Sequence, residues 1–195
     1  MGGVLCFDFI NTVHDRVNLP TSDYLFDYQA FIFWNKRLKV MPVNKIKRLE
    51  SFSRRNAKLA AKTLSEIKKR RETLYNLFSS IAAGKGIDNQ LLIKFNKILS
   101  TSLKHIWFVY SKGVLTLSWD DRIVNLYEPF WVIIKSAFDI VASGNFQRIK
   151  ECSECGWIFL DNTKNNNRKW CNMLTCGAKN KARTYYRKHR LMRNT

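Results

Sequence analysis

The sequence predicts an α+β protein that is mainly α-helical with one β-hairpin: a helical N-terminal domain, then a small four-cysteine zinc module and a basic helix. Apolar residues recur at helical spacing over most of residues 1–146, and one stretch there has a strand–turn–strand pattern. Four of the five cysteines lie between positions 152 and 176. At 195 residues and 46% hydrophobic content, the chain can form one substantial core and an appendage. We therefore expect domains at residues 1–146 and 147–195.

Each helix of the first domain is predicted from an apolar stripe with a start or stop signal. After an apolar run at residues 4–10, the helix over residues 23–38 is expected to have a broad aromatic face: Phe26, Phe31, Phe33 and Trp34. Further helices are expected from Pro42, over residues 57–83, from Asp88, and from about Pro129 to Gly144. Between the last two, the residues at about 105–119 are expected to form the hairpin around a Ser-Lys-Gly turn.

The charge of the chain indicates the class of its partner. Lys and Arg number 34 against 15 Asp and Glu, a formal net charge of +19. Such an excess attracts polyanions, whether nucleic acid or anionic lipid. No window approaches the roughly 20 continuous apolar residues of a membrane span, and Asp8 interrupts the start where a secretory signal would be apolar. We expect a cytoplasmic protein without membrane partners; no heptad repeat indicates an oligomeric state.

The cysteine spacing predicts one structural zinc ion bound by Cys152, Cys155, Cys171 and Cys176. The pattern is Cys-x2-Cys, fifteen residues, then Cys-x4-Cys, which supplies four thiolates to a tetrahedral ion. Four cysteines leave no position for an activated water, so the ion is expected to be structural and not hydrolytic. The alternatives are four unrelated core cysteines or a redox pair.

The segment after Cys176 predicts a basic helix that contacts nucleic acid. Ala178, Ala182, Tyr185, His189 and Met192 form an apolar stripe at helical spacing, and cations repeat on another face. The expected contacts to phosphates and base edges are Arg168, Lys169, Lys179, Lys181, Arg183, Arg187, Lys188 and Arg190. A solvated basic face that confers only solubility is the alternative. A second basic zone, with fourteen Lys and Arg between residues 36 and 71, is either an extension of this surface or a solvated pair of helix faces.

The segment from Cys152 to Thr163 (CSECGWIFLDNT), with Asn167 to Met173 (NRKWCNM) and Cys176-Gly177, resembles the CGNR zinc-finger family. The start of the chain, Leu5 to Val13 (LCFDFINTV), resembles the ABATE domain that precedes this finger in bacterial proteins. The resemblance implies a bacterial transcription regulator with a DNA-binding finger and a sensing or partner-binding N-terminal domain. It also implies the same four cysteines as zinc ligands, and places Arg168, Lys181 and Arg183 at basic positions of the motif.

The chain departs from the family's Cys-Gly-Asn-Arg, because its own residues there are Cys176-Gly177-Ala178-Lys179. Zinc binding should be retained, since neither of the last two residues is a ligand. Alanine lacks the side-chain amide, and lysine lacks the planar fork that arginine offers to a base. Base-specific readout is therefore expected to weaken at these two positions.

A polar cluster near the N-terminus is the candidate effector site: Asp8, Asn11, Thr12 and His14. The same residue types are routine in caps and buried hydrogen-bond networks, which is the structural alternative. No nucleophile motif, phosphate-binding loop or second histidine nearby indicates catalysis, so we expect a binding protein and not an enzyme. DNA is the favoured partner. Two rivals stay open: an RNA-binding or ribosome-associated zinc module that stacks bases on Trp157, Trp170, Tyr185 and Tyr186, and a small-molecule enzyme in the N-terminal domain.

Overall fold

The structure is a computed structural model that describes residues 2–18, 21–120 and 122–192, with side chains at all of these except 188 and 190–192. In order, its elements are α1 (Leu5–Ile10), α2 (Tyr28–Arg37), α3 (Val43–Arg55), α4 (Ala57–Ala82), α5 (Asn89–Leu103), β1 (Ile106–Ser111), β2 (Val114–Trp119), α6 (Glu128–Ser143), η1 (Phe146–Arg148), β3 (Ile149–Glu151), β4 (Ile158–Leu160), η2 (Met173–Gly177) and α7 (Ala178–Met192). Seven α-helices in this described part confirm the mainly helical α+β class. The antiparallel pair β1–β2 is the predicted hairpin, and β3–β4 is a second, short one that the sequence pattern did not indicate.

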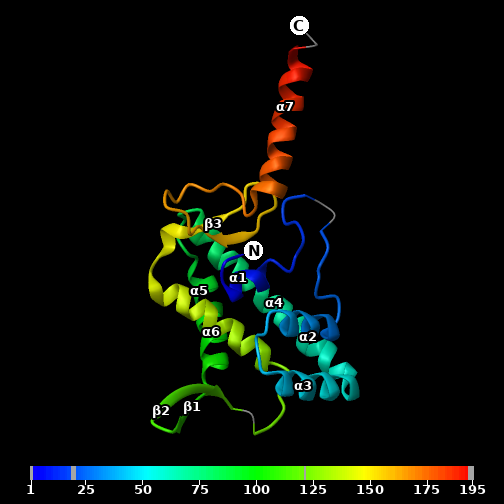
Figure 1. Ribbon diagram of the computed structural model, residues 1–195, viewed down its shortest axis with the longest axis vertical. Coiled ribbons are helices and arrows are strands. Elements are labelled where there is room, and N and C mark those ends of the chain that lie inside the picture. The colour runs from blue at the N-terminus through cyan, green and yellow to red at the C-terminus, as the bar shows by residue number, and fades with distance from the viewer. Residues whose placement is uncertain (1, 19–20, 121, 193–195) are drawn as a thin grey trace.

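The longest helix, α4, is the central element of the body (Figure 1). It contacts α1, α2, α3 and α5, and it also contacts β3 and β4. Leu64, Ile67, Leu74 and Phe78 form its buried face, at steps of three, four and seven residues. The helix thereby joins the helical body to the small hairpin that carries the first cysteines.

One apolar core extends from the helices into the β3–β4 hairpin. The ring of Phe9 lies 5.9 Å from that of Trp34 and 5.8 Å from that of Phe130. Ile149 of β3 and Ile158 of β4 are buried in the same cluster. The cysteine module is thus packed on the helical body, and the expected domain boundary after residue 146 stays a prediction.

Helix α2 begins later than predicted and buries a narrower face. Its first helical residue is Tyr28, because the Asp27 side chain caps the helix by accepting a hydrogen bond from the amide of Ala30 at 2.7 Å. Phe31 is buried, but Phe26 and Phe33 are 78% and 65% exposed. The broad aromatic face is therefore only partly buried, since only one side of α2 meets the core and Phe26 precedes the helix.

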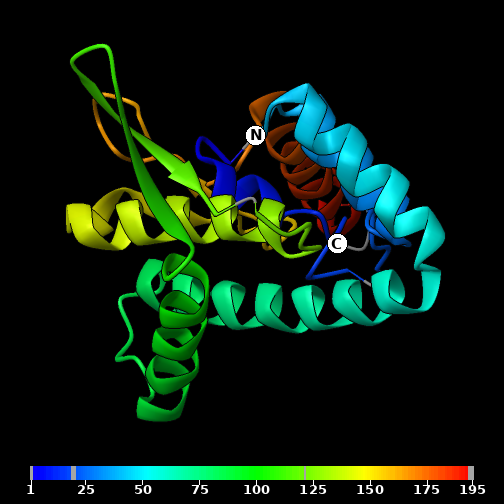
Figure 2. The same ribbon diagram turned by 90° about the horizontal axis from the view of Figure 1, so that it is seen from below.

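The β1–β2 hairpin projects from the body at the end opposite α7 (Figures 1 and 2). Lys112 and Gly113 form its two-residue turn with φ of 50° and 78°, the left-handed pair that tight hairpins favour. Trp107, Tyr110 and Leu115 are exposed on it. The hairpin is therefore held mainly by its own strand pairing and not by the core.

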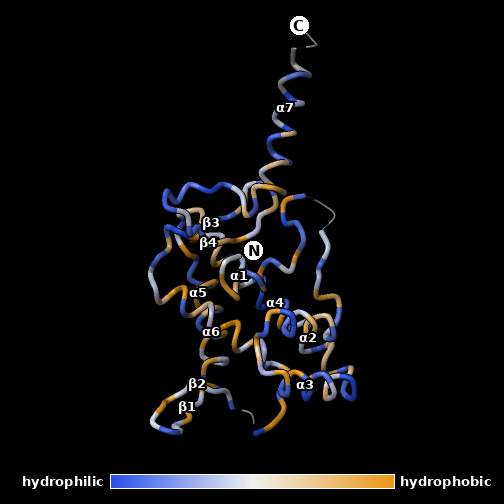
Figure 3. The backbone as a smooth tube through the Cα atoms, viewed as in Figure 1, coloured by the Kyte–Doolittle hydropathy of each residue, from blue (hydrophilic) through white to orange (hydrophobic). Residues whose placement is uncertain are grey.

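Helix α7 extends away from the body, and hydrophilic residues predominate along it (Figures 1 and 3). Its main contact is with η2, the short π-helical turn that precedes it. Ala178, Ala182, Tyr185 and His189 of the predicted apolar stripe are all exposed, and the Met192 side chain lies outside the described residues. None of the described helices combines the length and apolarity needed to cross a membrane.

Candidate metal centre

The four predicted ligands come together at the junction of the β3–β4 hairpin, the following loop and η2. Cys152 and Cys155 lie in the turn between β3 and β4, Cys171 ends the loop, and Cys176 lies in η2. Their sulfur atoms all lie within 4.8 Å of one another. The Cys155–Cys171 and Cys171–Cys176 Sγ–Sγ distances are both 3.7 Å. The structure thus gathers all four cysteines into one cluster.

The cluster has the size that one tetrahedral ion requires. Metal–sulfur bonds of about 2.3 Å place tetrahedral ligands about 3.8 Å apart, whereas a disulfide needs about 2.05 Å. All five cysteines are free thiols, and Cys6 is buried in the helical core away from the other four. The sulfurs therefore fit a four-thiolate metal site, and the alternative of four unrelated core cysteines is wrong.

The electrostatics of the cluster also call for a cation. Hydrogen bonds with Cys152 and Cys171, together with burial, raise the pKa of Cys155. The hydrogen bond with Cys152, and then burial and the neighbouring thiolate charges, raise the pKa of Cys171 to about 12. Hydrogen bonds from Cys155 and Cys171 lower the pKa of Cys152. The neighbours thus favour the Cys152 thiolate and oppose ionisation of Cys155 and Cys171, and a bound divalent ion would supply the positive charge that lets these thiols ionise together.

The Cys-x2-Cys turn depends on a glycine. The Gly156 amide donates to the Cys152 carbonyl at 2.8 Å, and the Cys152 amide donates to the Trp157 carbonyl at 2.8 Å. Gly156 has φ of 72°, and a Cβ there would lie 3.0 Å from Cβ of Arg16. Both the left-handed backbone and the contact with the helical body favour glycine at this position.

We expect Gly156→Ala to destabilise the protein by about 2 kcal/mol or more. Left-handed strain costs roughly 1–2 kcal/mol, and displacing Arg16 adds to it. Gly113→Ala is the matched control, because Gly113 also has positive φ but no atom within 4 Å of the added Cβ. Denaturant unfolding of both variants separates the cost of backbone strain, which both share, from the cost of the close contact with Arg16, which only Gly156→Ala has. Equal losses in the two variants would contradict the contact with Arg16.

The loop between the cysteine pairs is held by Asp161 and Arg168. Burial alone would raise the pKa of Asp161, but hydrogen bonds from Thr163 and the Arg168 amide hold it at about 2. The Arg168 guanidinium donates to the Cys171 carbonyl at 2.6 Å and lies 4.9 Å from the Phe159 ring centroid. Arg168, a predicted nucleic-acid contact, therefore also holds the backbone at a ligand.

The other predicted nucleic-acid residues differ in whether their charged groups already form ion pairs within the fold. Arg183 forms an ion pair with Glu154, a buried residue between the first two cysteines, and so ties α7 to the metal turn. No ion pair is shown within the described part of the chain for the exposed residues Lys169, Lys179, Lys181 and Arg187. The side chains of Lys188 and Arg190 lie outside the described residues.

Three of the four predicted effector residues line one cavity. Asp8, Asn11 and Thr12 lie on a pocket of about 880 Å³ between α1, α2 and the start of β4. His14 does not line it, but it hydrogen-bonds to Tyr24, which does. The structural alternative, that these residues serve buried hydrogen-bond networks, also holds for Thr12, because its hydroxyl donates to the Phe9 carbonyl at 2.8 Å. The polar cluster therefore both builds local structure and faces a cavity.

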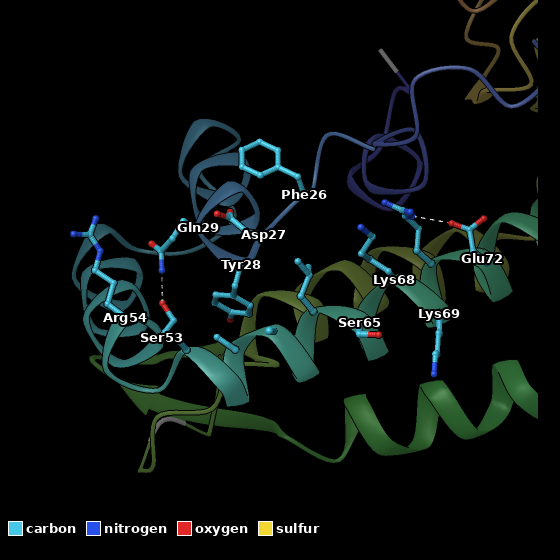
Figure 4. A pocket seen from close by; sticks show the side chains of 15 residues that line it. Phe26, Asp27, Tyr28, Gln29, Ser53, Arg54, Ser65, Lys68, Lys69 and Glu72 are labelled. Atoms are coloured by element: carbon cyan, nitrogen blue, oxygen red, sulfur yellow. Dashed lines mark hydrogen bonds and ion pairs between the residues drawn. The ribbon is translucent and has the colours of Figure 1, made fainter. Parts of the chain in front are cut away.

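A second cavity, of about 730 Å³, lies between α2, α3 and α4 (Figure 4). Gln29 and Ser53, hydrogen-bonded at 2.9 Å, lie at one end, and Lys68, Lys69 and Glu72 lie at the other. No sequence signal indicated this cavity, because its walls come from three separate helices. Lys68 already pairs with Asp23, so part of the second basic zone serves the fold.

This four-cysteine site on a short hairpin, followed by a basic helix, has the arrangement of a zinc finger. Residues 148–189 match the family model of the CGNR zinc finger, and all four clustered cysteines lie inside the match. No curated protein gives a significant match to the chain.

Proposed function

We propose that this protein is a zinc-loaded DNA-binding transcription regulator whose basic helix α7 contacts the nucleic acid. Four thiolates at tetrahedral spacing and the match to a zinc-finger family support zinc as the ion. The ion's part is structural: it neutralises the thiolates and orders the loop and η2. The proposed role is binding, so we propose no catalytic activity for this protein.

The observation that carries the proposal is the exposed, cationic helix projecting from the metal turn. Fifteen residues make α7 about 22 Å long, and the major groove of DNA admits an α-helix. A highly charged helix of this length is marginal in water by itself. The metal turn and the Arg183–Glu154 ion pair hold its first turns, and its cations suit a polyanion.

We expect the double variant Lys179→Ala/Arg187→Ala to weaken DNA binding about tenfold or more at low salt. If both residues meet phosphates, the slope of log affinity against log salt falls by about 2. Both are exposed and, within the described residues, without an ion pair, so the fold should be unchanged. Arg183 is left intact because it holds α7. Fluorescence anisotropy with the zinc-loaded chain and a duplex measures both quantities.

The matched control is Lys58→Ala/Lys62→Ala, which removes the same charge from exposed positions of α4. A loss of affinity confined to this control would assign binding to the second basic zone and contradict the role of α7. Selection of bound sequences from random DNA then separates a regulator from a general polyanion binder. With Ala178 and Lys179 in place of Asn and Arg, we expect the enriched site to be short or degenerate.

RNA is the second candidate, favoured by two aromatic side chains on α7. Tyr185 and Tyr186 are 60% and 71% exposed, and exposed aromatic rings stack on unpaired bases. Competition between duplex DNA and single-stranded RNA at equal salt decides between the two. Stronger competition by RNA would replace DNA in the proposal.

The helical domain is proposed to be the sensing part of the regulator, as its ABATE-like start implies. The cavity that Asp8, Asn11 and Thr12 line supports this role. The same cavity is what an enzyme acting on a small molecule would need, but the histidine nearest to it, His14, already shares a hydrogen bond with Tyr24.

A further inference from the structure

The cavity of about 880 Å³ has an aromatic lining that crosses from the helical body into the metal module. Tyr24, Phe33 and Trp34 line it from the helical side, and Trp157 lines it from the metal side. Trp157 follows Cys155 and Gly156 directly, so its position depends on the first cysteine turn. A molecule in this cavity therefore contacts both parts of the chain.

Hydrogen bonds fix the metal-side wall to the helical side. The Trp157 indole donates to the Val13 carbonyl at 2.7 Å. The Asn11 side-chain nitrogen donates to the Ile158 carbonyl at 2.8 Å, and the Asn11 side-chain oxygen accepts from the Ile158 backbone amide at 3.0 Å. The Arg16 amide donates to the carbonyl of Cys155, a metal ligand, at 2.9 Å. Movement of this wall is thus coupled to the turn that holds the ion.

The charged residues of the lining favour a cation. The chain has more than twice as many basic as acidic residues, yet the lining has two carboxylates, Asp8 and Asp27, and one guanidinium, Arg37. The Asp8 Oδ1 accepts one hydrogen bond, from the Gly2 amide at 2.8 Å, and a carboxylate has acceptor sites for several. Aromatic faces also attract organic cations.

We infer that this cavity binds a flat, largely apolar amine, and that its occupancy stabilises the metal module through Trp157. This rests on the proposed sensing role of the helical domain and names its ligand class. The aromatic walls take the apolar body of the ligand, and Asp8 takes the ammonium group. By linkage, a ligand that binds better when the module is ordered must shift the equilibrium toward the ordered module, which lowers the population from which a chelator can take the metal.

Contacts of the metal turn also connect the cavity wall to α7. Glu154 lies between the ligands Cys152 and Cys155, and its carboxylate pairs with Arg183. The Asn18 side chain donates to the Glu154 carbonyl at 3.2 Å. An occupied cavity therefore stabilises the turn on which the basic helix stands.

Two probes of matched ring and opposite charge test the ligand class: tryptamine and indole-3-acetate. Calorimetric titration of the zinc-loaded full chain should show tryptamine binding at least tenfold more tightly. Asp8→Asn, which retains an oxygen for the Gly2 amide, should abolish that preference, and Asp139→Asn, on the exposed face of α6, should retain it. Phe33→Ala, at an exposed position of the wall, should weaken tryptamine binding without unfolding the domain.

The coupling has its own readout, the rate at which a chelator removes the metal. Tryptamine should slow removal at least threefold, indole-3-acetate should not, and Asp8→Asn should cancel the effect. No tryptamine binding, equal affinity for the two probes, or an unchanged rate would each overturn the inference. Nucleic acid is absent from both measurements, so they can succeed even where the α7 variants disprove DNA binding.

Discussion

Cys171→Ser is expected to release the metal ion and to unfold the loop after β4 together with η2, while the helical core, in which Ile149 of β3 and Ile158 of β4 are buried, persists. Structural zinc provides roughly 10–16 kcal/mol of folding free energy in zinc-finger peptides. The small cluster of Cys152, Cys155, Phe159 and Cys176 cannot replace it, since a few side chains bury too little apolar surface. Metal analysis should show loss of one ion per chain. Hydrogen exchange should show lost protection over residues 161–177 and retained protection in α4.

Cys6→Ala is the control, because Cys6 is buried in the helical core and is not part of the cluster. This variant should keep its ion and the exchange pattern of the module. A chelated wild-type protein should reproduce the Cys171→Ser pattern. If residues 161–177 stayed ordered without metal, the view that four sulfurs replace a core there would be contradicted.

Arg71→Met is expected to destabilise the helical domain by roughly 3–5 kcal/mol, the cost of breaking a buried ion pair from one side. Arg71 is only 3% exposed. Its guanidinium donates to both Asp23 carboxylate oxygens, at 3.0 and 2.8 Å, and to the Thr12 hydroxyl at 2.8 Å. Methionine keeps much of the volume but leaves Asp23 with Lys68 as its remaining cation. Urea unfolding measures the difference.

The pH dependence of the stability difference between wild type and Arg71→Met tests whether ionised Asp23 stabilises the fold. Burial raises the pKa of Asp23, but hydrogen bonds from Arg71 and Lys68 outweigh it and hold the pKa at about 2, against an ordinary 3.8. Ionised Asp23 therefore stabilises the fold above pH 4, and this contribution disappears as the pH falls through 2. The wild-type and variant stabilities should converge over that range, and acid loss of the metal affects both alike.

Lys69→Met, at an exposed neighbouring position of α4, is the matched control and should change stability by no more than about 0.5 kcal/mol. A small loss in Arg71→Met, close to that of the control, would mean that the Asp23 network contributes little. The comparison also bears on function, because Arg71 belongs to the basic zone that the sequence offers as a phosphate surface.

Local patterns predicted much of the fold and the metal site. Thiolate spacing names the four ligands because a tetrahedral ion needs only short turns and a connecting loop. Apolar periodicity predicted α2 to α6 because each of these helices has one face toward the core, whereas the described residues of the stripe predicted for α7 are exposed. The start of α2 was predicted too early, at Asp23. In the structure Asp23 pairs with Val13 in an isolated bridge, and the Asp27 side chain caps the helix four residues later.

By itself, then, the sequence determined the metal ligands, the helical class and the basic character of α7, all of which depend on residues close together in the chain. Only the tertiary structure decided which basic side chains are engaged by partners within the fold and which, among the described residues, are exposed without an ion pair. Arg71, Arg168 and Arg183 look alike in sequence, yet each is engaged by partners within the fold. Trp157 likewise becomes a cavity wall only when the metal turn packs on the segment that follows α1. The physical reason is that hydrogen bonds and burial between distant segments depend on packing, which no local spacing encodes.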